Sequence, residues 1–188
     1  MGRWKPDARG RLEQAALDLF GERGFEQTTA AQIAERAELT ERTFFRHYAD
    51  KREVLFGNAH EFEQVFVDAL ADAPEKASPI DAMATTLEAA AALFLERHEF
   101  ARRRQAVIMA STELRERELI KLASLSAALA ATLRRRGVRD PAAALTAEAG
   151  MAVFRVGFER WVGDSGERDL VEYVRESLAE LRAVTAGE

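Results

Sequence analysis

The sequence predicts an all-α protein, and three observations lead to this expectation. Apolar residues make up 47% of the 188 residues, Ala and Leu are frequent, and only four residues are proline. Apolar side chains recur at the three- and four-residue spacing of a helix face, and long stretches contain no glycine. This composition is typical of an almost wholly helical chain, and we expect about nine helices, three short ones followed by six.

The first two predicted helices have clear ends. The first has its apolar residues on one face and ends at Gly24. That face consists of Leu12, Ala15, Ala16, Leu19 and Phe20. The second covers residues 30–37, and Thr29 and Gln32 at its start have the spacing of a capping box, in which each side chain bonds to the other residue's backbone N–H.

The third predicted helix forms a pair with the second. A short turn at Glu38 and Leu39 separates them, and Thr40 caps a helix that runs through Tyr48. A small residue, Ala34, lets the two helix axes approach closely. The free side of the last helix exposes Glu41, Arg42, Arg46 and His47. This is the arrangement of a helix-turn-helix, whose last helix enters the major groove of DNA.

Six further helices are expected after residue 50. Asp50 stands where the cap of a helix at 51–70 would fall, and Pro74 interrupts the chain after that helix. Ser78 and Asp140 each precede a proline, the combination of a helix cap and a first helical residue. The remaining predicted helices cover residues 79–98, 99–110, 111–137, 141–162 and 170–183.

The residue types argue against an enzyme and against a metal site. The chain has no cysteine, which excludes disulfides, thiolate nucleophiles and cysteine-based metal sites. Two of the three histidines lie in the adjacent pairs His60–Glu61 and His98–Glu99, which do not share a helix face for metal binding. The sequence contains no glycine-rich phosphate loop or nucleophile elbow. We therefore predict no catalytic residue, no metal and no cofactor.

The hydropathy and charge of the sequence indicate where the protein is located in the cell and how it could bind DNA. No segment has the pattern of a signal peptide or the length of a membrane span, so we expect a cytoplasmic protein without a membrane partner. The net charge is −5, and residues 1–51 hold nine Lys or Arg and nine Asp or Glu. If this part binds DNA, the placement of a few basic groups must therefore matter more than their sum.

The helix-turn-helix segment resembles the tetracycline-repressor (TetR) family of bacterial regulators. The matching residues are Leu19, Phe20, Gly24, Phe25, Thr28, Thr29, Ile33, Ala34, Ala37, Thr40, Thr43, Phe44, Phe45, His47, Tyr48 and Lys51. Residues 110–137 resemble the branch of that family that contains mycofactocin-type regulators. The resemblance implies a helix-turn-helix DNA-binding domain at residues 1–50 and a six-helix effector-binding and dimerisation domain at residues 51–188.

The same resemblance implies a function. We expect a transcriptional regulator that binds a pseudo-palindromic, double-stranded DNA operator as a homodimer and, as a repressor, leaves it when a ligand binds. The sequence leaves two alternatives open. In the first, the protein is an activator. In the second, it is a DNA-binding protein whose large domain serves only dimerisation or a partner protein.

The resemblance implies DNA contacts for seven residues, and these are Thr29, Thr40, Arg42, Thr43, Arg46, His47 and Lys51. Base-edge contacts are implied for Arg42 and Thr43, and either kind of contact for Arg46. The other four would contact phosphates. Family members often add contacts with the DNA backbone or minor groove near the N-terminus, at the positions that here hold Arg3, Lys5, Arg9 and Arg11.

Two positions depart from the family pattern. Phe45 stands where the family commonly has Tyr, and it has no hydroxyl for a phosphate, while Tyr48 stands where Phe is usual and is expected to point into the core. Glu38 stands where the family usually has Gly, in a turn that tends towards a positive φ. A residue other than glycine adopts that conformation at the cost of some strain.

The C-terminal part contains large apolar residues that are candidates for lining an effector pocket: Phe62, Phe66, Leu87, Met109, Met151, Phe154 and Phe158. Met and Phe suit an adaptable hydrophobic cavity, although the same residues at helical spacing also form ordinary core. We therefore expect a small lipophilic or amphipathic effector. We expect Arg102, Arg103 and Arg104 to form a solvated basic cluster, with binding of the anionic group of an acyl-CoA as the alternative.

The last two predicted helices carry more apolar surface than one bundle easily buries. The residues concerned are Leu145, Val153, Val156, Trp161, Leu170, Val174 and Leu178. We expect them to form a four-helix interface between two copies that are related by a twofold axis.

Overall fold

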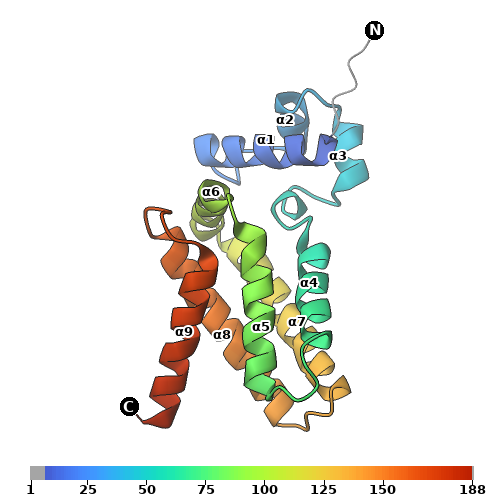
Figure 1. The fold of residues 1–188 in the computed structure, drawn as a ribbon. Coiled ribbons are helices and arrows are strands. Elements are labelled where there is room, and N and C mark those ends of the chain that lie inside the picture. The colour runs from blue at the N-terminus through green and yellow to red at the C-terminus, as the bar shows by residue number, and fades with distance from the viewer. Residues whose placement is uncertain (1–6, 188) are drawn as a thin grey trace. The chain divides into compact units, whose positions relative to one another are not determined.

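The structure is a computed structural model that describes residues 7–187, and within this range it is wholly helical (Figure 1). Its elements are α1 (Ala8–Arg23), α2 (Ala30–Arg36), α3 (Glu41–His47), η1 (Glu53–Leu55), α4 (Ala59–Ala71), α5 (Pro79–Ala91), η2 (Ala92–Phe94), α6 (His98–Ala110), α7 (Thr112–Arg135), α8 (Ala142–Val162) and α9 (Leu170–Ala186). The two η elements are 3₁₀ helices of three residues each. The predicted all-α class is confirmed.

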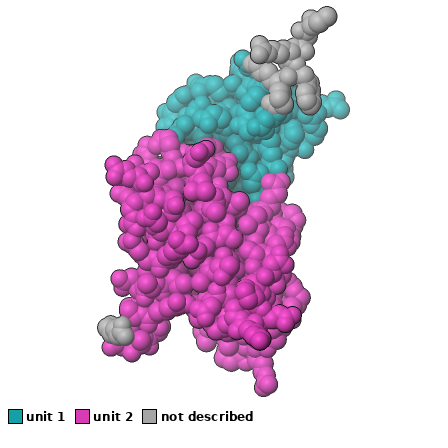
Figure 2. Space-filling view, viewed as in Figure 1, with its two compact units in different colours: residues 1–58, 103–118 teal, residues 59–102, 119–188 magenta. Residues whose placement is uncertain are grey.

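The helices group into two compact units, which Figure 2 shows in teal and magenta. Unit 1 contains the residues up to 58 together with residues 103–118, and unit 2 contains residues 59–102 and 119–188. Helices α6 and α7 therefore each contribute residues to both units. The sequence predicted a single boundary after residue 50, and the assignment of DNA binding to 1–50 and effector binding to 51–188 stays a prediction.

Unit 1 is built on the predicted face of α1. Leu12, Ala15, Ala16, Leu17, Leu19 and Phe20 are buried there, and α1 and α3 both pack against α2. Ile33 and Phe44 are fully buried at the centre of the three helices. The predicted capping box of α2 is confirmed, since Thr29 Oγ1 accepts from the Gln32 N–H at 3.2 Å and Gln32 Oε1 accepts from the Thr29 N–H at 3.0 Å.

The helix predicted at 51–70 is interrupted, and this part of the prediction is wrong. Asp50 instead closes a turn that leads into the short η1, because its Oδ1 accepts from the N–H groups of Arg52 at 2.8 Å and Glu53 at 3.2 Å. Gly57 then stands in a turn before α4, and glycine is a poor helix former. A Cβ at Gly57 would lie 2.5 Å from the ring of Tyr48, so the close approach of that ring requires glycine here.

Unit 2 has α5 at its centre, in contact with α4, α8 and α9. Helices α8 and α9 also pack on each other, as Figure 1 shows in orange and red. A Cβ at Gly157 of α8 would lie 3.2 Å from the backbone of Val174 in α9, so glycine allows this close packing. Among the described residues, no helix combines the length and apolarity needed to cross a membrane.

Two predicted helix ends in unit 2 differ from the structure. Helix α5 begins as expected, with Ser78 as its cap and Pro79 as its first residue, but it ends at Ala91 instead of continuing to His98. Helix α8 does not start with an aspartate cap. Both carboxylate oxygens of Asp140 accept from Arg134, at 2.7 and 3.0 Å, because the end of α7 lies close enough to compete for this carboxylate.

Candidate functional site

Helix α3 presents one free face on a firmly packed base. Phe44 anchors it, being fully buried and with its ring centroid 5.5 Å from that of Tyr48. Thr40 caps the helix, because its Oγ1 accepts from the Thr43 N–H at 3.2 Å, and the two hydroxyl oxygens are 3.0 Å apart. The exposed residues are Glu41, Arg42, Phe45, Arg46 and His47. Charged and polar groups of α3 are therefore available to a partner at the predicted positions.

The turn before α3 has the strained backbone expected from the sequence. Glu38 has a φ of 56°, in the left-handed region that favours glycine. Arg11 of α1 lies against this turn, since its Nε donates to the carbonyl of Ala37 at 3.1 Å and its Nη2 to that of Glu38 at 3.2 Å. The guanidinium of Arg11 is thus bound within the unit rather than presented at the free face of α3. Arg3 and Lys5, for which DNA contacts were also expected, lie outside the described residues.

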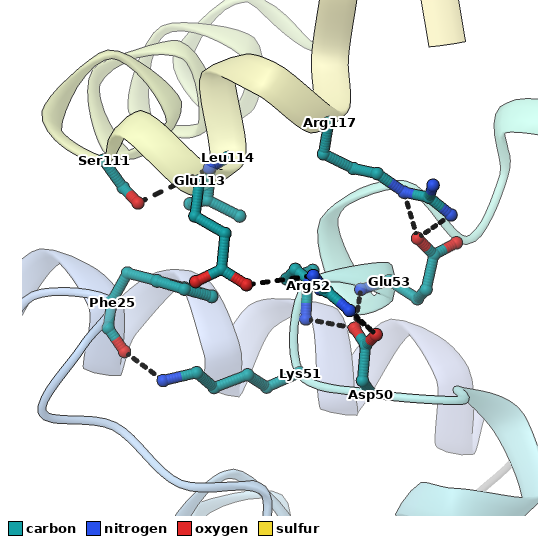
Figure 3. A network of polar contacts seen from close by, with 9 residues as sticks. All are labelled: Phe25, Asp50, Lys51, Arg52, Glu53, Ser111, Glu113, Leu114 and Arg117. Carbon is teal, nitrogen blue, oxygen red and sulfur yellow. Dashed lines mark hydrogen bonds and ion pairs between the residues drawn. The ribbon is translucent and has the colours of Figure 1, made fainter. Parts of the chain in front are cut away.

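Lys51 is also bound within unit 1. Its ammonium donates to the carbonyls of Phe25 at 2.9 Å, Thr28 at 3.2 Å and Glu26 at 3.5 Å, and it lies 4.1 Å from the centre of the Phe25 ring. Figure 3 shows the bond to Phe25. Lys51 therefore differs from the other predicted DNA contacts, because its charged group lies on the turn between α1 and α2.

The aromatic pair at the end of α3 lies as the sequence predicted. Tyr48 is 2% exposed and its hydroxyl donates to Glu13 Oε1 at 3.1 Å, so it is part of the core. Burial, with the charge of Glu13, raises the pKa of Tyr48. Phe45 is 53% exposed, and its ring lies on the outside of α3 without a hydroxyl to offer a phosphate.

A network of ion pairs joins the segment after α3 to the start of α7 (Figure 3). Arg52 lies 2.6 Å from Asp50 and 3.0 Å from Glu113, and Arg117 donates from Nε to Glu53 at 2.6 Å. The hydrogen bond from Arg52 lowers the pKa of Asp50. Within unit 1, these bonds fix the first turns of α7 against the residues that connect α3 to α4.

The arginine run of α6 is occupied by intramolecular contacts. Arg102 pairs with Glu99 one turn earlier at 2.9 Å and is exposed. Arg103 pairs with Asp18 of α1 at 2.6 Å. These partners reduce the charge that the run can offer to an anionic ligand.

Arg104 is the most buried member of the run. It donates to the carbonyl of Leu55 at 3.0 Å and to Glu118 at 3.2 Å, and its guanidinium lies 5.0 Å from the centre of the Phe56 ring. Burial lowers the pKa of Arg104. The structure therefore favours an intramolecular role for Arg103 and Arg104 over both a solvated cluster and a contact with an anionic ligand.

Six of the seven predicted effector-lining residues lie together in the core of unit 2. The ring centroids of Phe62 and Phe66 are 4.9 Å apart, those of Phe66 and Phe154 are 5.3 Å apart, and Phe154 stacks on Phe158 at 6.3 Å. Leu87 and Met151 belong to the same apolar core. The sequence pattern therefore identified residues that share one interior region.

Phe94 and Trp161 also belong to this aromatic cluster, although neither is among the residues predicted from the sequence to line the pocket. The Phe94 ring lies 5.8 Å from Phe62, 5.5 Å from Phe158 and 5.8 Å from Trp161. A spacing of seven residues, two helical turns, separates Phe94 from Leu87 and Trp161 from Phe154. That spacing was the signal that could have identified both residues.

Met109 does not join the cluster. It lies in unit 1, not unit 2, and its side chain is 55% exposed. The apolar run at the end of α6 suggested that Met109 faces inward, but Val107 and Ile108 are the members of the run that are buried. On helical geometry Met109 points about 100° away from Ile108 and about 200° away from Val107.

Most residues predicted for a dimer face are instead buried within the chain. Val153, Trp161, Leu170, Val174 and Leu178 belong to the core of unit 2. The indole of Trp161 donates to the carbonyl of Arg168 at 3.1 Å. Helices α8 and α9 bury these faces against each other and against α5, and only Leu145, at 65% exposure, and Val156, at 40%, stay on the surface.

Two segments of the chain match models of known protein families. Residues 13–56 match the family model described as bacterial regulatory proteins, tetR family, and residues 77–186 match the model of the MftR C-terminal domain. The HTH-type transcriptional regulator TcmR of Streptomyces glaucescens is 41% identical over 81 residues, which is 43% of this chain. The match spans 36% of the length of that relative.

Solved structures resemble nearly the whole chain. FadR of Bacillus subtilis, in complex with stearoyl-CoA, aligns with a TM-score of 0.64 and 20% identity over 92% of this chain and 96% of the other. FadR of Thermus thermophilus, in complex with lauroyl-CoA, aligns at 0.55 and 24% over 94% and 93%. PfmR, also of Thermus thermophilus, aligns at 0.53 and 28% over 90% and 94%. The described helices therefore follow a fold that these regulators share.

Proposed function

Because the chain belongs to the TetR family of DNA-binding transcriptional regulators, we propose that it is a ligand-released repressor that binds a pseudo-palindromic operator as a homodimer. The free face of α3 carries this proposal. Arg42, Arg46 and His47 are exposed there on a helix held by the buried Phe44. A short helix held on a packed base with one free polar face suits insertion into the major groove.

The residues of this face divide by the kind of contact they can make. Arg42 and Thr43 are proposed to meet base edges, and a bidentate arginine on guanine is worth about 1–3 kcal/mol of discrimination. Arg46 meets either a base or a phosphate. Thr29, Thr40 and His47, all exposed, are proposed to contact phosphates on either side.

Selection of bound DNA from a random library, followed by mobility-shift titration, tests this proposal. We expect a pseudo-palindromic consensus, and Arg42→Ala relaxes the preference at one position of each half-site. Lys76→Ala, in the loop before α5, is the control and leaves binding unchanged. Equal affinity and equal sequence preference for wild type and Arg42→Ala would remove the base-reading role.

Helix α8 supplies the proposed dimer contact. A stripe of small and apolar residues with alternating spacings of three and four runs along its uncovered face, and its members are Ala142, Leu145, Ala149, Ala152 and Val156. This is the spacing of a helix-helix seam, and small residues allow the axes to approach closely. A second copy that presents the same stripe would bury it, as a twofold interface requires.

The dimer has a measurable consequence for DNA binding. Two recognition helices must lie about 34–36 Å apart to enter successive major grooves. We expect Leu145→Glu with Val156→Glu to convert the dimer into a folded monomer in sedimentation, and to weaken operator binding. A wild-type protein that sediments as a monomer at micromolar concentration contradicts the dimer proposal.

The aromatic cluster of unit 2 supports a lipophilic or amphipathic effector. Phe62, Phe94 and Phe158 are only partly buried, whereas Phe66 is fully buried, so the cluster extends from the core towards the surface. Two structurally similar regulators were solved with acyl-CoA molecules. We therefore take an acyl-CoA as the first effector to test, with its chain among these rings.

Isothermal titration separates the possibilities for the effector. Stearoyl-CoA and lauroyl-CoA are compared with the corresponding free acids and with coenzyme A alone. Binding of the thioesters, with release of operator DNA, supports the proposal. No heat from any of them favours the alternative in which unit 2 serves dimerisation without an effector.

A further inference from the structure

In unit 1, the charged groups of Arg11 and Lys51 donate hydrogen bonds to backbone carbonyls of the two turns that flank α2. We propose that they are positioning residues for the recognition helix α3, and that neither neutralises a DNA phosphate. Arg11 lies on the turn at residues 37–38, which leads into α3. Lys51 lies on the turn at residues 25–28, which leads into α2.

The Arg11 contact stabilises a turn that glycine would form without strain. Glu38 has a left-handed backbone, and the Leu39 N–H closes the turn by donating to the Ala34 carbonyl at 2.8 Å. The carbonyls at the end of a helix carry partial negative charge, and a cation there is favourable. Arg11 therefore favours the one turn geometry that sets the angle between α2 and α3.

The Lys51 contact uses the full donor capacity of the ammonium. A lysine has three N–H donors and no acceptor, and the three carbonyls within reach are those of Phe25, Glu26 and Thr28. The side chains of Phe25 and Thr28 in this turn are buried, at 4% and 1% exposure, whereas Glu26 and Gln27 are exposed. A phosphate could recruit Lys51 only by leaving these carbonyls without their donor, which costs free energy because the bonds to Phe25 and Thr28 are partly shielded from water.

The two contacts act on the same helix from opposite ends. Lys51 follows α3 in the chain and binds the turn before α2, whereas Arg11 comes from α1 and binds the turn after α2. Helix α2 is thereby fixed between α1 and α3. The angle of α3 then depends on both cations, although neither belongs to its free face.

The salt dependence of DNA binding distinguishes a positioning role from a direct bond to phosphate. The slope of log K against log salt becomes shallower by about 0.9 for each phosphate that the protein no longer neutralises in duplex DNA. For Lys51→Met and Arg11→Met we expect operator affinity to fall about tenfold or more with the slope unchanged, because the ordering of α3 is weakened while every ion pair with DNA remains. The matched controls Lys76→Met and Arg139→Met, both in unit 2, change neither quantity.

A second variant keeps the test informative if Arg11→Met is poorly folded. Glu38→Gly removes the need for a strained turn, and a glycine there adopts the left-handed backbone readily. In the double variant Arg11→Met with Glu38→Gly, we expect operator affinity at least about threefold higher than in Arg11→Met alone. Glu38→Gly should have a smaller effect on affinity in the wild type. We also expect the Leu39 amide to exchange its hydrogen faster in Arg11→Met than in the wild type, and to return towards the wild-type rate in the double variant.

Either of two results overturns the proposal. One is a slope that becomes shallower by about one unit in Lys51→Met or Arg11→Met, as the removal of an ion pair with a phosphate requires. The other is an Arg11→Met defect that Glu38→Gly leaves unchanged.

Discussion

The hydroxyl of Tyr48 donates a hydrogen bond to the carboxylate of Glu13, 3.1 Å away, and joins the end of α3 to the middle of α1. Both residues belong to unit 1, and Tyr48 is 2% exposed. The recognition helix is therefore fixed at both ends, by the capped turn at Thr40 and by this buried phenol.

The alkaline stability of the fold should depend on Tyr48. Burial raises the pKa of Tyr48 above its ordinary value of 10.0. The native state therefore keeps the phenol proton to higher pH than the unfolded chain does. Stability from this group is fully present below pH 10 and is lost as the pH rises above it, because only the unfolded chain then releases the proton. We expect Tyr48→Phe to lose stability less steeply above pH 10 in urea unfolding. An unchanged steepness contradicts this prediction.

The two adjacent phenylalanines of α3 should differ widely when truncated. Phe44 is fully buried and Phe45 is 53% exposed. Phe44→Ala should cost about 3–5 kcal/mol of stability because it leaves a cavity in unit 1. Phe45→Ala should stay within about 0.5 kcal/mol, as for an exposed substitution. Chemical denaturation measures both. Similar losses for the two variants would contradict the burial of Phe44 and the exposure of Phe45.

The arginine run of α6 offers a matched comparison. Arg104→Met leaves Glu118 and the Leu55 carbonyl without their donor, and we expect a loss of about 1–3 kcal/mol. Arg102→Met removes an exposed pair with Glu99, which solvent screens, so we expect a much smaller loss of stability than for Arg104→Met. Urea unfolding curves decide the order. A larger loss for Arg102→Met contradicts the intramolecular role of Arg104.

Effector affinity should depend on the aromatic cluster and not on Met109. Phe94→Ala and Phe154→Ala each remove a ring from the cluster and should weaken acyl-CoA binding about tenfold or more, a loss of about 1.4 kcal/mol or more. Met109→Ala, in the other compact unit, should leave affinity unchanged. Titration calorimetry on the folded variants checks this prediction. A strong effect of Met109→Ala together with none from the phenylalanines reverses the assignment.

Local features of the fold could be predicted because their causes lie close together in the chain. The capping box of Thr29 and Gln32 involves residues three apart, and the positive φ of Glu38 follows from a turn of fixed length between two helices. The apolar face of α1 follows from helical spacing alone. The exposed positions Arg42, Arg46 and His47 on α3 were identified for the same reason.

The tertiary structure decided what long or large side chains contact. From the sequence, Lys51 and Arg11 are cations beside a DNA-binding helix, and a flexible charged side chain can reach either a phosphate or a carbonyl. The fold places backbone carbonyls within that reach. Trp161 was expected on a dimer face, yet the approach of α9 to α8 encloses it.

The sequence by itself determined most of the helices, the caps at Thr29, Thr40 and Ser78 and the helix-turn-helix, since each depends on residues within about two helical turns of one another. Only the tertiary structure decided that residues 103–118 join unit 1, and that Lys51 and Arg11 bind turns 23 to 27 residues away in the chain. Such contacts depend on which distant groups the packed helices bring within hydrogen-bond distance. The resemblance identified the helix that we propose to meet DNA, and the fold shows how that helix is held.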